Sequence, residues 1–216
     1  MDTFHICLAL GPLAVYLLLL GTMNLARRPF MITGARDAAA LGVALAGFVL
    51  SGPMQLFLPE EAALHFGGYV WLLLLSFYAL CIVLWMLVAR PRLVVYNIAL
   101  DKLRPLLTEL APTLDSQAAW AGDSLTMPQI GVQLHLEDFH MMQNVSLVAN
   151  GEDQSYSGWQ RLERALRSRL RETEVHRNPR GVSLITSALL MLGTMLYKAI
   201  ANPQAVAQGF RDMLQL

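Results

Sequence analysis

Three long stretches without charged side chains occupy the first part of the chain. Residues 3–26, 38–59 and 62–89 contain 24, 22 and 28 consecutive residues, respectively, without Asp, Glu, Lys or Arg. A helix of about 20 residues crosses the ~30 Å hydrocarbon core of a bilayer, and lipid offers no hydrogen-bond partner to a more open backbone. The pattern therefore predicts transmembrane helices at about 3–26, 38–59 and 67–89, within a membrane region that covers residues 1–89.

A fourth apolar stretch lies near the C-terminus and is shorter. Residues 181–197 are uncharged, and Lys198 can extend its ammonium group to the interface while residues 199–201 lengthen the span. We predict a fourth transmembrane helix over 181–201; the alternative is a helix that lies in the interface. Asn202-Pro203 is then a typical helix start, and the apolar stripe after it predicts an interfacial amphipathic helix over 202–216.

Between the third and fourth stretches, residues 90–180 have the pattern of a water-facing domain. Residues 132–137 alternate strictly between apolar and polar side chains, which predicts a strand with one buried face. Strand-forming runs also occur at 93–98, at 118–127 with an interruption at Gly122-Asp123, and at 145–149. Helical stripes begin near Asp101, which we expect to cap its helix, and near Ser157. The order is β-α-β-β-β-α. We therefore expect an α-helical integral membrane protein with a small two-layer α+β domain between helices 3 and 4.

Composition agrees with a membrane protein and argues against several other classes. Charged residues make up 15% of the chain, against about 25% in soluble domains. The 16 basic and 16 acidic residues balance, so the net charge indicates no nucleic-acid partner. Cys7 and Cys81 both lie in apolar stretches, which argues against a disulfide framework and a paired-cysteine metal site. The first apolar stretch has no basic residue before it and no small-residue cleavage motif after it, so we expect it to be retained.

The placement of basic residues predicts an orientation. Seven arginines lie next to the ends of the expected spans on the side of the α+β domain, whereas Lys198 and Arg211 are the basic residues on the opposite side. The positive-inside rule then places residues 90–180 in the cytoplasm and both termini outside, in a plasma or inner membrane. The seven are Arg27, Arg28, Arg36, Arg90, Arg92, Arg177 and Arg180.

Two groups of polar residues are candidate metal or acid–base sites. The first is on and after the alternating strand, where His135 and Glu137 share a face because residues two apart in a strand point the same way. Asp138 and His140 follow them. The alternative interpretation is that this face is polar because it is solvated. The first group is His135, Glu137, Asp138 and His140.

The second group is expected at the outer membrane surface. Glu61 and His65 are four residues apart and would share a helix face, and His5 begins the first span at the same depth. A metal site needs three or more convergent ligands, and the alternative interpretation is that these helix ends are polar because water is there. The second group is His5, Glu60, Glu61 and His65.

Motifs of known chemistry are missing from the sequence. The chain contains no nucleophile elbow, phosphate-binding loop, paired-histidine zinc helix or dinucleotide-binding fingerprint, so the sequence indicates no enzyme class and no cofactor. We expect a membrane-anchored scaffold that presents its cytoplasmic domain to a protein partner, or that associates with itself through its membrane helices and that domain. Two alternatives stay open. One is a membrane-embedded enzyme or metal- or proton-handling protein, and the other is a small transporter subunit.

Overall fold

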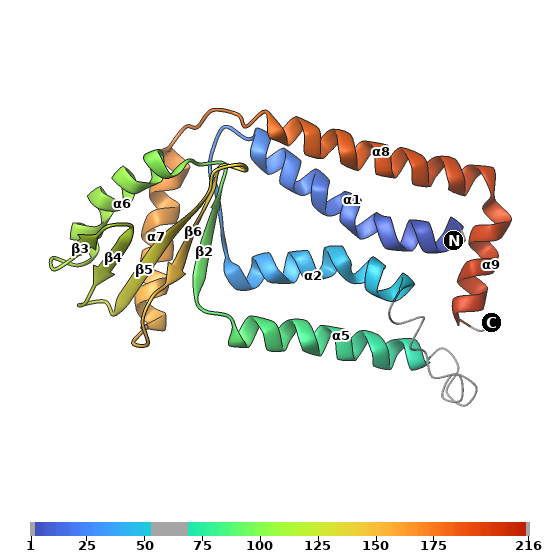
Figure 1. Cartoon of the computed structure of the whole chain (residues 1–216), viewed down its shortest axis with the longest axis horizontal. Coiled ribbons are helices and arrows are strands. Elements are labelled where there is room, and N and C mark those ends of the chain that lie inside the picture. The colour runs from blue at the N-terminus through green and yellow to red at the C-terminus, as the bar shows by residue number, and fades with distance from the viewer. Residues whose placement is uncertain (1–2, 53–68, 215–216) are drawn as a thin grey trace. The chain divides into compact units, whose positions relative to one another are not determined.

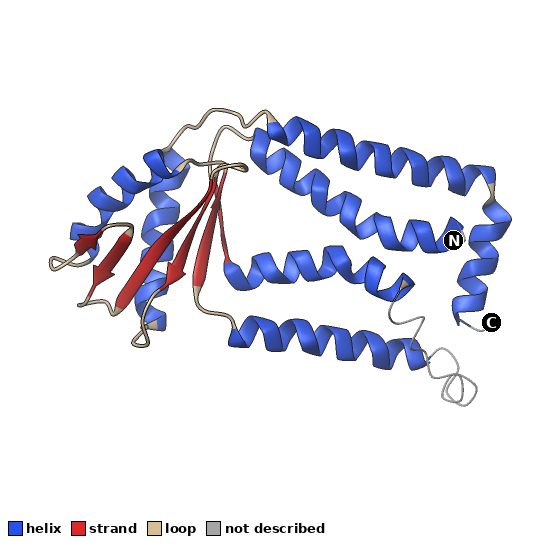
Figure 2. Ribbon diagram, viewed as in Figure 1, coloured by secondary structure: helices blue, strands red, loops and turns tan. Residues whose placement is uncertain are grey.

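The computed structural model describes residues 3–52 and 69–214, in which long apolar helices are joined to one antiparallel sheet (Figures 1 and 2). The described helices are α1 (Thr3–Leu25), α2 (Gly34–Ser51), α5 (Tyr69–Val88), α6 (Leu100–Leu114), α7 (Tyr156–Glu172), α8 (Arg180–Ala201) and α9 (Pro203–Leu214). The strands are β1 (Phe30–Thr33), β2 (Arg92–Tyr96), β3 (Ala119–Ala121), β4 (Ser124–Met127), β5 (Val132–Phe139) and β6 (Asn144–Ala149).

The chain divides into two compact units. The sheet domain consists of Thr22–Asp37 and Ala89–Gly181, and the helical unit consists of the described parts of Met1–Gly21, Ala38–Val88 and Val182–Leu216. The sheet domain is therefore larger than the expected insert of residues 90–180. It also includes the last turn of α1, all of β1 and the first turn of α2.

Four helices in the described residues are long and apolar enough to cross a membrane: α1, α2, α5 and α8. This matches the four spans expected from the uncharged stretches. The bounds differ most for the second span, because α2 begins at Gly34 rather than near residue 38. The expected end of that span at residue 59 lies outside the described residues.

Close helix contacts in the helical unit involve small residues. A methyl group at Gly47 of α2 would overlap the backbone oxygen of Leu8 in α1. The hydroxyl of Tyr78 in α5 donates to the carbonyl of Gly42 in α2 at 2.7 Å, and the Ser51 hydroxyl donates to the His5 carbonyl at 3.2 Å. Small residues let helix backbones approach this closely, as is usual for helices that pack in lipid.

The sheet has six antiparallel strands in the order β1-β2-β6-β5-β4-β3. Its longest pairing joins β5 to β6, with Leu136 opposite Leu147. The expected β-α-β-β-β-α order is incomplete in two places. The interrupted strand at 118–127 is a hairpin of β3 and β4 that turns at Gly122 and Asp123, because Gly122 adopts a left-handed conformation that reverses the chain. The second difference is β1, which comes from the loop between the first two apolar helices and was not expected in the sheet.

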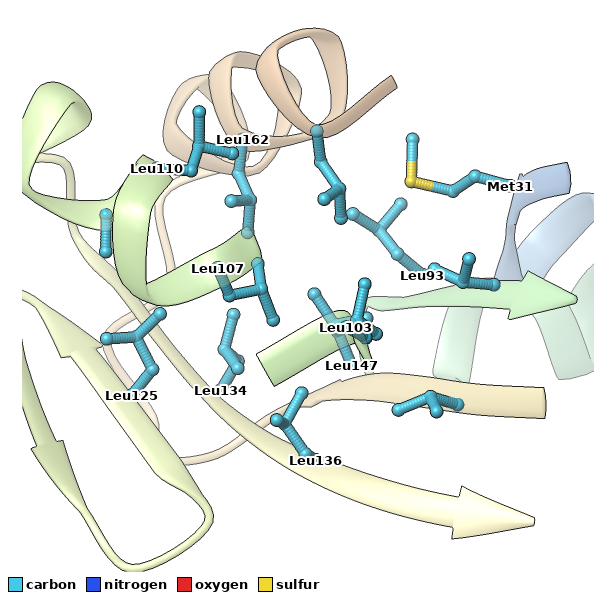
Figure 3. Packing of buried hydrophobic residues seen from close by; sticks show 14 of the residues in the cluster. Met31, Leu93, Leu103, Leu107, Leu110, Leu125, Leu134, Leu136, Leu147 and Leu162 are labelled. Carbon is cyan, nitrogen blue, oxygen red and sulfur yellow. The ribbon is translucent and has the colours of Figure 1, made fainter. Parts of the chain in front are cut away.

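The helices α6 and α7 cover one face of the sheet. Buried side chains of the two helices and of that face form the core of the domain (Figure 3). Buried and exposed positions alternate along β5 from Val132 to Glu137, as predicted. The stripe of α7 is also buried as expected: Trp159 is 6% exposed, and Leu162, Leu166 and Leu170 are 2% exposed or less. Met31 from β1 joins the same cluster, so the first loop contributes to the core.

The sequence predicts the start of α7 more accurately than the start of α6. Ser155 caps α7 by accepting a hydrogen bond from the Gly158 amide at 3.2 Å, close to the predicted start at Ser157. The expected cap of α6 by Asp101 is wrong, because the cap position is Ala99 and Asp101 lies in the first turn. A carboxylate in that turn still interacts favourably with the positive end of the helix dipole.

A pair of neighbouring substitutions in β5 tests the two faces of the sheet. Leu134→Ala should lower the free energy of unfolding by about 2–5 kcal/mol, because it removes a fully buried side chain and leaves a cavity. His135→Ala, at an exposed position, should change it by no more than about 0.5 kcal/mol. Urea-dependent pulse proteolysis of the full chain in detergent measures both. Equal losses from the two variants would contradict the assignment of faces.

Candidate functional site

The alternating strand β5 presents His135 and Glu137 on the face of the sheet that α6 and α7 leave uncovered. Both residues are exposed. The Nδ1 atom of His135 lies 3.1 Å from the Ser124 hydroxyl of β4, which is its partner across the sheet. Glu137 lies opposite Ser146 of β6. The cross-strand neighbours of this pair are therefore two serines and, opposite His135 on β6, Val148.

Asp138 and His140 are not on that face. Asp138 lies opposite Val145, whose side chain is in the core, so Asp138 points to the helix-covered side at the end of β5. Its carboxylate lies 3.6 Å from Nδ1 of His140, and the His140 side chain is 93% exposed. The strand thus divides the four-residue group into two pairs on opposite sides of the sheet. Among residues 3–52 and 69–214, no three His, Cys, Asp or Glu side chains converge as metal ligands would.

Only one member of the second candidate group can be placed. His5 lies in the first turns of α1, where its ring is 5.6 Å from the ring of Phe4 in an edge-on arrangement. Glu60, Glu61 and His65 lie outside the described residues, so the convergence expected at the outer surface stays a prediction.

The main polar feature of the sheet domain is a set of three buried asparagines that the sequence reasoning missed. Asn24, Asn97 and Asn178 are 0%, 1% and 2% exposed, respectively. They come from the last turn of α1, the end of β2 and the segment before α8. We call these three residues the asparagine cluster. Buried amide groups are costly unless they are hydrogen-bonded, so this cluster constrains the local structure.

Asn178 makes the most contacts of the cluster. Its side-chain Nδ2 donates to Asn24 Oδ1 at 3.2 Å and to the Met142 carbonyl at 3.0 Å. Its Oδ1 accepts from the Arg180 amide at 3.1 Å, at the start of α8. Its own amide donates to the Asn24 carbonyl at 3.0 Å. One side chain therefore connects the end of α1, the β5–β6 turn and the start of α8.

Asn97 completes the connection from the other side. It adopts a left-handed conformation with φ 58°, which asparagine tolerates better than most residues. Its Nδ2 donates to the Ala26 carbonyl at 2.7 Å. A further backbone bond, from the Val175 amide to the Arg27 carbonyl at 2.9 Å, aligns residues 24–27 with residues 175–178. The two segments are 148 residues or more apart in sequence but run side by side.

The start of α2 is attached to the same sheet by charge and hydrogen bonding. Asp37 in its first turn lies 3.3 Å from the guanidinium of Arg92, and the Tyr96 hydroxyl donates to the other carboxylate oxygen of Asp37. Both partners belong to β2. There is also no room for a side chain at Gly34, because an added Cβ would overlap Arg92.

Comparison with known proteins gives no relative: no protein-family model, no curated protein and no solved structure matches this chain.

Asn178→Ala tests the asparagine cluster. The change leaves buried backbone groups unsatisfied, which costs about 1–3 kcal/mol and corresponds to a roughly 5- to 150-fold faster local opening. Trypsin cleavage after Arg177 in the folded full-length protein should accelerate by that factor. The exposed Asn150→Ala is the matched control and should leave the rate unchanged. An unchanged rate in Asn178→Ala would show that the cluster does not hold this segment.

Proposed function

We propose that this protein is a membrane-anchored scaffold whose sheet domain, on the cytoplasmic side, contacts a protein partner. One observation carries the proposal: each of the four apolar helices has one end directly next to the sheet domain in the chain. The last turn of α1 and the first turn of α2 belong to that domain, α5 ends one residue before it, and α8 begins inside it. If the four helices span a bilayer, all four of these ends lie on one side of it.

The basic residues support the cytoplasmic side. The seven arginines that predict the orientation all fall within the two sequence segments of the sheet domain. The positions of the helix ends do not by themselves require this distribution. The positive-inside rule counts arginine and lysine close to the ends of spans. Lys198 and Arg211, near the other end of α8, are the basic residues of the helical unit.

The uncovered face of the sheet is the surface that supports contact with another protein. It carries His135 and Glu137 near its centre, with Gln133 and Phe139 along the same strand. Phe139 is 68% exposed, so the surface mixes a large apolar side chain with hydrogen-bonding groups. Such a mixed surface is usual in interfaces between proteins that also exist separately. In the part of the chain that the structure describes, no three His, Cys, Asp or Glu side chains gather as a metal site would.

Site-specific photo-crosslinking in cells tests this proposal. A benzophenone amino acid at position 135, on the uncovered face, should form a discrete protein adduct that mass spectrometry identifies reproducibly. Position 168, exposed on α7, is the control on the other side of the domain and should form none. Equal adducts at both positions, or none at 135, would contradict a partner on this face. A purified protein that carries a stoichiometric metal or cofactor and no partner would contradict the scaffold itself.

A further inference from the structure

The turn between β5 and β6 lies beside the ends of two apolar helices. The Met142 carbonyl in this turn accepts from Asn178, and the Gln143 carbonyl accepts from the Ile98 amide at 2.7 Å. Asn178 is three residues before the uncharged stretch of α8, a reach of at most about 10 Å of extended chain. The headgroup layer on each side of a bilayer is about 5–8 Å thick. If α8 spans, the turn lies within the layer of lipid headgroups or directly outside it.

Large apolar side chains are exposed on and beside this turn. Phe139 is 68% exposed and Met141 is 70% exposed. Phe30 of β1, 45% exposed, lies in the same row across the sheet, since Phe30 is opposite Tyr96 and Phe139 is opposite Asn144 at the same end of β6. Burying such side chains in the boundary between headgroups and acyl chains is favourable, as it is for interfacial helices.

Arginines lie on the two segments that Asn178 joins to each other and to the turn. Residues 24–28 and 175–181 contain Arg27, Arg28, Arg177 and Arg180 and no acidic residue, and Glu174 comes just before the second segment. Arg27, Arg28 and Arg177 are exposed, and they form no ion pair with any residue in the described ranges. The backbone bond from Val175 to Arg27 fixes the two segments next to each other. The result is a positive surface that has no acidic partner within its own segments.

We propose that this edge of the sheet domain binds anionic phospholipid headgroups. Phe139 and Met141 enter the interfacial layer, and the guanidinium groups of Arg27, Arg28 and Arg177 pair with lipid phosphates. Guanidinium groups match phosphate oxygens with two parallel hydrogen bonds, and each basic residue near an anionic surface contributes about fivefold in affinity. We call this surface the lipid-contact edge. The proposal rests on the membrane assignment made above. It shares Phe139, at the end of β5 next to the turn, with the face proposed for the protein partner, and its other residues are separate from that face.

Fluorescence quenching in bilayers of defined composition tests the lipid-contact edge. Full-length protein, with Cys7 and Cys81 replaced by Ala, carries an environment-sensitive dye at Met141→Cys and is reconstituted into nanodiscs. The discs contain phosphatidylcholine alone or with phosphatidylglycerol, and a trace lipid bears a nitroxide on its headgroup. Quenching should be at least twofold stronger in the anionic discs. The triple variant Arg27→Gln, Arg28→Gln, Arg177→Gln should reduce it to the value in neutral discs.

A second dye position controls for general proximity. Tyr156→Cys, at the opposite end of α7 and 79% exposed, lies about 24 Å along the helix from Glu172 and should show no dependence on lipid charge. Equal quenching at 141 in neutral and anionic discs, or no quenching in either, overturns the lipid-contact edge. Flotation and resistance to alkaline extraction report separately on membrane insertion. Protein that fails to insert overturns both the membrane assignment and this inference, whereas inserted protein without quenching overturns the inference alone.

Discussion

The pairing of β1 with β2 is the interaction on which the rest of the structure depends. The eight residues between α1 and α2 bring backbone groups that need hydrogen-bond partners, and β1 satisfies them along the edge of β2 from Phe30–Tyr96 to Thr33–Leu93. The pairing also places Met31 in the core. The helix α2 follows β1 directly, beginning at Gly34. Its first turn is also fixed to β2, because Asp37 contacts Arg92 and Tyr96.

The asparagine cluster extends this attachment to α1 and α8. The three side chains are 2% exposed or less, and Asn97 and Asn178 each donate to groups on other segments, so separating these segments would break buried hydrogen bonds. The end of α1 and the start of α8 are thereby held by the β5–β6 turn, and the arginines next to them are held together as well. For the proposed scaffold role, this construction would stabilise the part of the sheet domain that is joined to the helix ends.

Local patterns in the sequence predicted much of this fold. The alternation in β5 and the apolar stripe of α7 are signals of one strand and one helix, and the uncharged stretches identify the four long helices. By contrast, β1 has only four residues and its pairing partners lie 60 to 66 residues away, so no local periodicity reveals it. The end of the second expected span and three of the outer candidate residues lie where the structure gives no description.

The polar residues show the same division between local and long-range information. The two-residue period of a strand correctly puts His135 and Glu137 on one face of the sheet. The same period places Asp138 on the other face, although it is adjacent to Glu137 in the sequence. Asn178 joins Asn24 across 154 residues, which no spacing rule covers. One signal was available, however: Asn178-Pro179 repeats the helix-start dipeptide of Asn202-Pro203, and it does lie at the start of α8.

The central claim is that all four apolar helices cross the membrane and meet the sheet domain on its cytoplasmic side. Labelling of single cysteines in intact cells with a membrane-impermeant maleimide tests it most directly, in a background without Cys7 and Cys81. Glu152→Cys, exposed in the sheet domain, should react only after permeabilisation, whereas Ala62→Cys and Gln204→Cys should react in intact cells. Labelling of position 152 in intact cells, or the same accessibility at 152 and 204, would contradict the claim, and the second result would show that α8 does not span.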